Sequence, residues 1–302
     1  MQRLPPYGFP QRSPMLRMEC PIAPHTVQTD TGRSFFGAFN FSISKPFMQD
    51  SATWWMPGYQ TKQERIAIAG ADDLVIRALL DRQQFFDPFG EAHRLGISSA
   101  AWPLFGLLWP SGLQLAARMA LKPVCSSERI LEIGCGLALA SLVGHRRGAD
   151  VTASDCHPLA ASFLEENLRL NDLAAMKYRH GHWSDPELPP GRESASGLCV
   201  VRGRYDLIIG SDVLYERGAT ADLAGFIARH LSPAGEVRII DPERGNRPAF
   251  NRQMAARGFL MREERLNRPS SVGAAAYKGR LLFYRRAAEI VTLQRDCTPS
   301  TG

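Results

Sequence analysis

The chain has 302 residues, which is enough for a full α/β core in one or two domains. Its net charge of +6 does not indicate a specific nucleic-acid partner, because only five of the 36 basic residues are lysine and the arginines are scattered along the chain. The six cysteines contain no C-x-x-C pair, which favours reduced thiols and a cytoplasmic location.

The first 122 residues predict an irregular segment followed by a helical extension. Residues 1–60 contain eight prolines and no sustained hydrophobic period, so we expect them to be irregular or partly disordered. Residues 71–82 predict an amphipathic helix, and Ser111 is a candidate N-cap for a second helix. Residues 95–117 carry no charge, but prolines and glycines divide them into pieces too short for a membrane span. We therefore expect residues 61–122 to pack on the domain that follows.

From residue 123 onwards strands and helices alternate, which is typical of a doubly wound parallel sheet. The expected strands cover residues 130–133, 151–155, 176–183, 205–211 and 236–241, with an antiparallel pair at 259–266 and 280–286. The expected helices follow the first glycine-rich turn and cover residues 158–170, 220–231 and 248–257. The sequence therefore predicts an α/β domain over residues 123–287. Its fold is a mostly parallel seven-stranded sheet with helices on both faces and an antiparallel last strand, before a tail at 288–302.

A glycine-rich turn follows the first of these strands, with the sequence Glu132-Ile-Gly134-Cys135-Gly136-Leu-Ala-Leu. Glycines let backbone N–H groups approach a ligand, and the helix that follows adds the positive end of its dipole. A dinucleotide-binding turn has its small residue at the position of Leu139, and no Gly-Lys-Ser/Thr follows as a P-loop requires. The pattern Glu-x-Gly-x-Gly-x-Ala resembles motif I of class I S-adenosylmethionine (SAM) methyltransferases. We interpret Cys135 as a small filler in this turn.

Three further residues are candidates for an adenosine site. Asp155 ends the second strand and can accept hydrogen bonds from both hydroxyls of a ribose, although a turn-forming role is the alternative. Trp183 follows the third strand, where an adenine can stack on it, and the alternative is a core tryptophan. Trp109 can close the same pocket, but on position alone core packing is favoured.

The fourth strand ends in Ser211-Asp212-Val-Leu-Tyr215-Glu, at the sheet edge where ligands bind in parallel sheets. Asp212 can orient an amine whose lone pair must point at a methyl group, or it can cap a helix. Tyr215 can line the same channel. The segment 241–244, Asp-Pro-Glu-Arg, either contacts substrate or caps the next helix. No histidine spacing predicts a metal site.

These segments together resemble the seven-β-strand protein-lysine methyltransferase group. The resemblance covers residues 95–286 and rests on five segments in this order: Leu-Trp-Pro-Ser-Gly, Ile-Leu-Glu-Ile-Gly-Cys-Gly-Leu-Ala, Val-Thr-Ala-Ser-Asp, Glu-Asn-Leu-Arg-Leu-Asn and Ser-Asp-Val-Leu-Tyr-Glu. It implies SAM contacts from Trp109, the motif from Glu132 to Gly136, Asp155, Trp183 and Ser211, and a substrate-channel role for Asp212 and Tyr215. The segment 241–244 is similar to the branch that modifies electron transfer flavoprotein, with Glu243 where glycine is usual. His182 stands where many relatives have a carboxylate or an amide.

We therefore predict an enzyme, a SAM-dependent N-methyltransferase that methylates lysine or another amine of a protein. A neutral amine would attack the sulfonium methyl group in line, and the protein would contribute positioning and electrostatics. One alternative is a small-molecule N-methyltransferase of the nicotinamide type, which predicts a closed pocket. Another is a non-catalytic SAM-binding protein, which predicts binding without turnover. An NAD-dependent oxidoreductase is disfavoured by Leu139 and by the lack of a Tyr-x-x-x-Lys motif. The sequence predicts neither the identity of the acceptor nor the oligomeric state.

Overall fold

The computed structural model describes residues 59–185, 199–216, 218–270 and 275–287, all within one compact unit, Trp55–Gly302. The predicted irregular segment at 1–60 therefore lies almost entirely outside the described residues, and the predicted tail at 288–302 lies wholly outside them.

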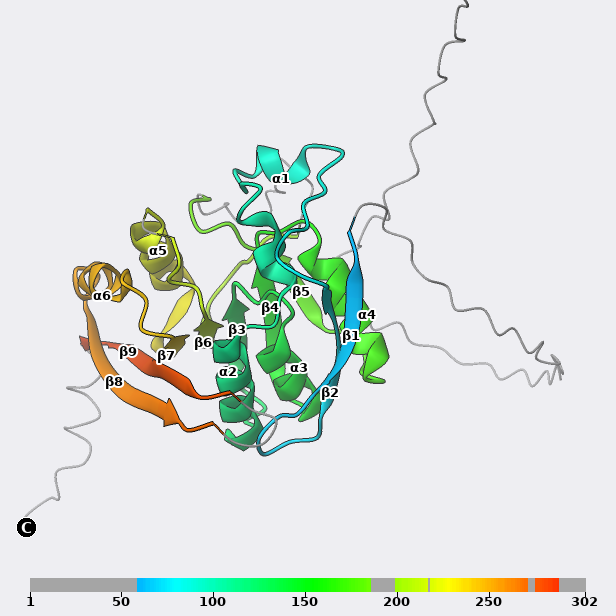
Figure 1. The fold of residues 1–302 in the computed structure, drawn as a ribbon. Helices are drawn as coiled ribbons and strands as arrows, with labels where there is room; N and C mark the ends of the chain where they lie inside the picture. Colours follow the sequence, from blue (N-terminus) through cyan, green and yellow to red (C-terminus); the bar gives the residue numbers. More distant parts are fainter. Residues whose placement is uncertain (1–58, 186–198, 217, 271–274, 288–302) are drawn as a thin grey trace, which may run out of the picture. The chain divides into compact units, whose positions relative to one another are not determined.

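The unit is built around a seven-stranded sheet with the strand order β5-β4-β3-β6-β7-β9-β8 (Figure 1). Its strands are β3 (Arg129–Ile133), β4 (Asp150–Asp155), β5 (Lys177–His180), β6 (Tyr205–Ser211), β7 (Leu231–Asp241), β8 (Phe259–Arg268) and β9 (Tyr277–Arg286). Strands β3 to β7 pair in parallel, and β9 is antiparallel to both of its neighbours. The predicted doubly wound, mostly parallel sheet with an antiparallel last strand is confirmed.

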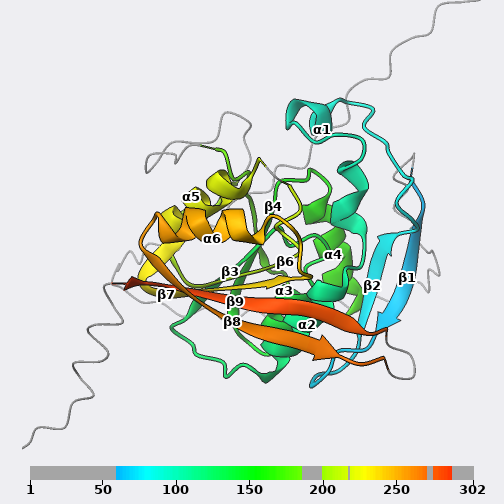
Figure 2. The same ribbon diagram turned by 60° about the vertical axis from the view of Figure 1, so that its left-hand side comes forward.

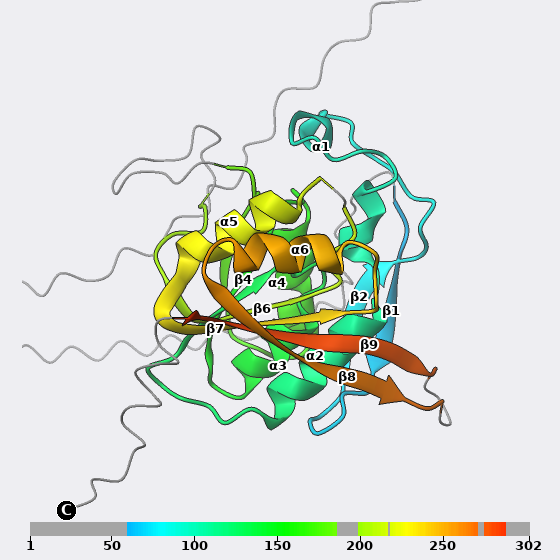
Figure 3. The same ribbon diagram turned by 90° about the vertical axis from the view of Figure 1, so that its left-hand side faces the viewer.

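Helices cover both faces of this sheet because its strands are apolar on both sides. Along β3, Ile130 packs into one hydrophobic cluster and Leu131 into the other. The first cluster includes α2 (Pro110–Leu121), α3 (Leu139–Arg146) and α4 (Ala160–Leu170). The second includes α5 (Thr220–His230) and α6 (Arg247–Ala255), on the opposite face (Figures 2 and 3).

The helix predicted over residues 71–82 is wrong. Residues of this segment form β2 (Leu74–Leu79), which pairs antiparallel with β1 (Thr61–Ile66) in a separate two-stranded sheet. Leu74, Ile76 and Ala78 are buried, whereas Val75 and Arg77 are half-buried, so the true period of this segment is two.

Side chains of α4 and of its C-cap residue form hydrogen bonds with the second edge of β2. Asn171 Oδ1 accepts the N–H of Val75 at 2.9 Å, and its Nδ2 donates to the carbonyl of the same residue at 2.7 Å. Asn167, one turn earlier, contacts Arg77 in the same way. These side-chain amides therefore form the hydrogen bonds that a neighbouring strand would otherwise form with β2. The hydrophobic period of residues 71–82 alone does not indicate these contacts.

The segment between β2 and the main sheet contains a short helix α1 (Glu91–Arg94), a 3-10 turn η1 (Trp102–Gly106) and α2. The predicted N-cap role of Ser111 is wrong, because α2 begins at Pro110 and the Ser111 hydroxyl lies 2.9 Å from the hydroxyl of Tyr277 in the core. The uncharged residues 95–117 contribute buried side chains such as Trp102 and Leu115. Within the described ranges, no helix is long and apolar enough to cross a membrane.

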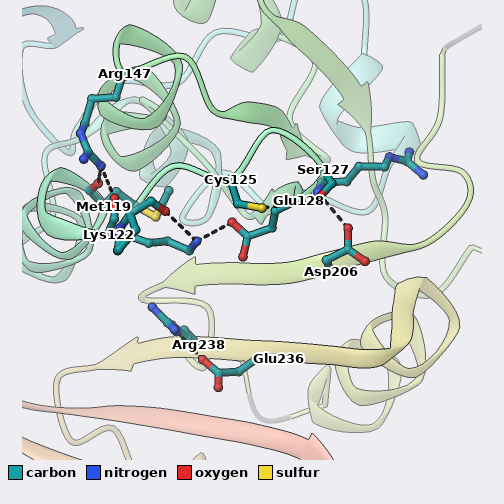
Figure 4. A network of polar contacts seen from close by, with 11 residues as sticks. Met119, Lys122, Cys125, Ser127, Glu128, Arg147, Asp206, Glu236 and Arg238 are labelled. Carbon is teal, nitrogen blue, oxygen red and sulfur yellow. Dashed lines mark hydrogen bonds and ion pairs between the residues drawn. The ribbon is translucent and has the colours of Figure 1, made fainter.

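A polar network fixes the connection between α2 and the sheet (Figure 4). Arg147, which follows α3, donates to the carbonyls of Met119, at 2.7 Å, and Lys122. Lys122 also forms an ion pair with Glu128, next to β3. These contacts hold the end of α2 against both α3 and the start of β3.

Among the described residues, Cys125, Cys135 and Cys156 have free thiols. The cytoplasmic location stays a prediction.

Candidate active site

One cavity of about 830 Å³ opens at the carboxyl ends of β3, β4 and β6. All ten residues predicted from the sequence line it: Trp109, Glu132, Gly134, Cys135, Gly136, Asp155, Trp183, Ser211, Asp212 and Tyr215. They come from the start of α2, the turn after β3 and the ends of the neighbouring strands. The structure thus brings the ten residues together, while their individual roles stay predictions.

The glycine-rich turn is crowded by protein atoms on two sides. Gly134 and Gly136 have φ angles of +56° and +52°, a region that favours glycine. A Cβ atom on Gly136 would lie 2.8 Å from the carbonyl oxygen of Phe105. A Cβ atom on Gly134 would lie 2.9 Å from the side chain of Val213 and 3.6 Å from the ring of Trp183. Both glycines are therefore required by the backbone conformation and by the lack of space.

The carboxylate of Glu132 stabilises the helix that follows this turn. It accepts hydrogen bonds from the backbone N–H of Ser141, at 2.8 Å, and from the hydroxyl of the same residue. Burial raises the pKa of Glu132 to about 7, against these hydrogen bonds, which lower it. Although Glu132 lines the cavity, its carboxylate already has partners in the first turn of α3.

Asp155 connects the glycine-rich turn to the end of β4. Its Oδ2 accepts the N–H of Gly136 and its Oδ1 accepts the N–H of His157, both at 2.9 Å. Burial raises the pKa of Asp155, and the backbone hydrogen bonds oppose this rise. A carboxylate oxygen has two lone pairs, so each oxygen can accept one more hydrogen bond. Asp155 can therefore hold the turn and still bind two hydroxyl groups.

His157 has a packing role that the sequence did not predict. Its ring stacks on Phe105, with 3.7 Å between centroids and 12° between planes, and lies edge-on to Trp102. Burial lowers the pKa of His157 to about 3, so the imidazole is neutral at physiological pH. In the part of the chain that the structure describes, no three His, Cys, Asp or Glu side chains are grouped as a metal site requires.

Asp212 is anchored through its backbone and through one carboxylate oxygen. Its φ angle is +59°, and its N–H donates to the carbonyl of Ile240 in β7 at 3.0 Å. Oδ1 accepts a hydrogen bond from Nη2 of Arg244 at 2.9 Å. Oδ2 is buried and has no hydrogen-bond partner among the described residues. Asp212 therefore lines the cavity and keeps one carboxylate oxygen without a partner among the described residues.

The segment 241–244 does not cap the next helix, because α6 has Asn246 at its N-cap and no side-chain cap hydrogen bond, while substrate contact by Arg244 stays a prediction. The backbone N–H of Arg244 donates to Oδ2 of Asp241 at 2.9 Å, which fixes the turn after β7. Its side chain lines the cavity. Asp241 is fully buried, and burial raises its pKa to about 6. Asp212 and Arg244 lie 32 positions apart in the sequence, so only the pairing of β6 with β7 brings them together.

Two arginines contact the ring of Trp109, which lines the cavity at the start of α2. The guanidinium groups of Arg82 and Arg244 lie 5.1 and 5.8 Å from the ring centroid. The indole N–H donates to the carbonyl of Leu104 at 2.8 Å. Arg82 follows β2 and forms no ion pair with a carboxylate of the described residues. No motif in the sequence indicated Arg82, because it lies outside the segments that carry the resemblance.

The cavity meets solvent beside Tyr215, whose side chain is 43% exposed. Glu216 and Asp222, which are also exposed, line the same rim. Burial raises the pKa of Tyr215 above its usual value, so the phenol stays protonated near neutral pH. Trp183, by contrast, is half-buried against the second hydrophobic cluster.

The chain is similar in sequence to known lysine methyltransferases. The family model described as lysine methyltransferase matches residues 106–249. The electron transfer flavoprotein beta subunit lysine methyltransferase of Danio rerio is 33% identical over 145 residues, which are 47% of this chain and 51% of that protein. Protein N-lysine methyltransferase METTL21A of the same species is 27% identical, over 50% of this chain and 67% of the relative. The EEF1A lysine methyltransferase 3 of Mus musculus is 23% identical, over 62% and 74%.

The chain thus spans about half the length of the first of these relatives. The matched segment contains the glycine-rich turn, Asp155, Asp212 and Arg244, and it coincides with the parallel part of the sheet. Residues 106–249 are therefore similar to the lysine methyltransferase family, and they carry the parallel part of a doubly wound seven-stranded sheet.

Proposed function

We propose that this protein is a SAM-dependent N-methyltransferase whose acceptor is a lysine of another protein. The observation that carries this proposal is the composition of one cavity. It is lined by Asp155 and the glycine-rich turn, and also by a carboxylate, Asp212, with a buried and unused oxygen. Such an arrangement suits a nucleoside cofactor next to an amine.

The residues present fit SAM. The cavity volume of about 830 Å³ lies within the range of ligand pockets. Asp155 would hold the ribose hydroxyls and Trp183 would stack on the adenine. The glycine-rich turn and Trp109 would surround the methionine part, and Arg82 would neutralise its carboxylate. Arg82 suits this role because it lines the cavity and has no carboxylate partner in the described part of the chain.

When bound, SAM supplies a methyl group on a positively charged sulfur and a neutral thioether as leaving group. The protein must then present a neutral amine in line with that methyl group. Oδ2 of Asp212 would accept an N–H of the amine and so direct its lone pair. The proton that the ammonium loses would pass to Asp212 or to water. Tyr215 stays protonated, so it would line the channel rather than act as a base.

The exposure of Tyr215 supports a protein acceptor over a small molecule. An enzyme that methylates a small molecule encloses its acceptor. A lysine of a protein must instead reach the cavity with its long side chain, through a channel that is open to the surface. The rim formed by Tyr215, Glu216 and Asp222 is open, and its two carboxylates would attract an ammonium group.

Labelled SAM, the purified protein and a cell lysate test this proposal. We expect label on one or a few proteins, with mass spectrometry placing the methyl group on lysine. Label only in small molecules would support the nicotinamide-type alternative. SAM binding without any transfer would indicate a non-catalytic binding protein. Asp155→Ala serves as the control that should remove labelling.

A further inference from the structure

Asp212 and Arg244 form a pair whose backbones are both fixed by the end of β7. The N–H of Asp212 is bonded to Ile240, and the N–H of Arg244 is bonded to Asp241. Because β6 and β7 are parallel neighbours, the turns that follow them leave the sheet side by side. The ion pair between the two side chains, at 2.9 Å, therefore connects two well-anchored turns.

The pair is not satisfied within the protein. Oδ2 of Asp212 and Nε of Arg244 are buried and have no hydrogen-bond partner among the residues described. The Asp212 side chain is only 9% exposed, so water has limited access to it. Buried carboxylate oxygens in folded proteins normally have partners, so an unpartnered one on a residue that lines a cavity is a candidate for pairing with a ligand. The N–H of an amine could donate a hydrogen bond to this oxygen.

Asp212 also has a backbone conformation that needs support. Its φ angle of +59° is uncommon for a residue other than glycine, although aspartate and asparagine tolerate it best. Such conformations persist only where surrounding contacts determine them. The bond to Ile240 and the ion pair with Arg244 are two such contacts.

Arg244 also contacts Trp109, another residue that lines the cavity. Its guanidinium lies 5.8 Å from the centroid of the Trp109 ring, and Trp109 is the N-cap residue of α2. A planar guanidinium can form an ion pair and stack on a ring at the same time, whereas a lysine ammonium acts only as a point charge. Arg244 therefore links the carboxylate at the end of β6 to the indole of Trp109.

We infer that Arg244 is a positioning residue for methyl transfer, which holds Asp212 so that Oδ2 is the oxygen that receives the acceptor amine. This inference rests on the proposed function. In this arrangement Arg244 does not contact the reacting atoms, and it acts through Asp212 and Trp109. It should therefore govern turnover much more than cofactor affinity.

The test compares Arg244→Gln, Arg244→Lys, Asp212→Asn and the double variant Asp212→Asn/Arg244→Gln with the wild-type protein. Arg247→Gln is the matched control, because Arg247 lies three residues further along, pairs with Glu263 at 3.5 Å and does not line the cavity. For each protein, kcat and the KM for the acceptor are measured with an acceptor protein found by the labelling experiment. Calorimetry with S-adenosylhomocysteine gives cofactor affinity, and thermal unfolding checks that the variant is folded.

We expect Arg244→Gln and Asp212→Asn each to lower kcat by about tenfold or more, the lower end for an orienting or acid–base group. Affinity for S-adenosylhomocysteine should stay within about threefold of wild type. The double variant should be no slower than the slower single variant, because residues that act as a unit are not additive. Arg244→Lys should lie between wild type and Arg244→Gln, and Arg247→Gln should match wild type.

Three results would overturn the inference: a kcat of Arg244→Gln equal to that of Arg247→Gln, multiplicative losses in the double variant, or a loss of cofactor affinity as large as the loss of kcat. If Arg244→Gln does not fold, Arg244→Lys decides, and wild-type turnover in that variant overturns the inference. A wild-type protein that transfers no methyl group overturns the proposed function as well, whereas an active wild type with an unaffected Arg244→Gln overturns only this inference.

Discussion

Asn167 in α4 pairs with the backbone of Arg77 in β2, accepting its N–H at 2.8 Å and donating to its carbonyl at 3.4 Å. The side chain of Asn167 is fully buried, so neither group of Arg77 has water as a substitute partner. Asn171 repeats the arrangement at Val75. The hairpin β1–β2 is thus attached to the domain by amide groups that imitate a strand.

Replacing Asn167 with alanine should destabilise the protein by about 1–3 kcal/mol, because it leaves a buried backbone N–H and carbonyl without partners. Urea denaturation measures the loss, and hydrogen exchange should show faster exchange at the amide of Arg77. Glu165→Ala is the control, because Glu165 is exposed on the same helix. An equal stability of the two variants would contradict the proposed attachment.

Replacing Asp155 with alanine should weaken binding of S-adenosylhomocysteine by roughly 1.5–3 kcal/mol for each charged hydrogen bond lost. The change also removes the acceptor for the N–H groups of Gly136 and His157, so stability should fall too. Calorimetry and denaturation separate the two effects. Unchanged cofactor affinity in a folded variant would mean that another residue holds the ribose.

Replacing Arg82 with glutamine should remove a preference between two ligands. The wild-type protein should bind S-adenosylhomocysteine more tightly than its analogue without the carboxylate, by about tenfold for one partly exposed charged contact. Arg82→Gln should bind both about equally. Arg65→Gln, an exposed change on β1, should behave as wild type. A preserved preference in Arg82→Gln would show that the carboxylate binds elsewhere.

Glu132 should make the stability of the protein depend on pH. Its pKa is raised from 4.5 to about 7 in the folded state, so between these pH values the folded state binds more protons than the unfolded state. The contribution of Glu132 to the free energy of unfolding is therefore fully present below about pH 4.5. It is lost as the pH rises through 7, and the loss is about 3 kcal/mol in total.

Denaturation of the wild type and of Glu132→Gln across this pH range tests the expectation. Glutamine can still accept the hydrogen bonds from Ser141 but does not titrate, so the decline with pH should become shallower in the variant. Asp241, whose pKa is raised to about 6, should still stabilise the folded state of the variant below that pH, so some dependence of stability on pH should remain. Parallel curves for the two proteins would show that Glu132 does not carry the effect.

The sequence predicted the main sheet well because its signals are local. The apolar run at 205–211 predicts β6 with its observed bounds, and the glycine-rich turn and strand ends indicate ten residues that line one cavity. The helix predicted for residues 71–82 was wrong because Leu74 and Ala78 fit a helical spacing as well as an alternating one. The strand is favoured by hydrogen bonds from Asn167 and Asn171, which lie about 90 residues away in the sequence.

Local sequence patterns could not predict two contacts between residues of the cavity that are distant in the sequence. The contact between Asp212 and Arg244 depends on strand order, and the approach of Arg82 to Trp109 depends on the hairpin that precedes the matched segment. A residue type at the end of a strand indicates that a ligand can bind there. It does not indicate which distant side chain donates a hydrogen bond to the carboxylate found there.

Phe105 contacts the site twice, through its carbonyl beside Gly136 of the glycine-rich turn and through its ring on His157. A shortened chain that began at residue 123 would keep all seven strands of the main sheet and yet lack these contacts and the indole of Trp109. We expect such a fragment to fold around a turn open to water, with little hold on the cofactor. Insertions and deletions between β2 and α2 should then weaken cofactor binding even where the main sheet is unchanged.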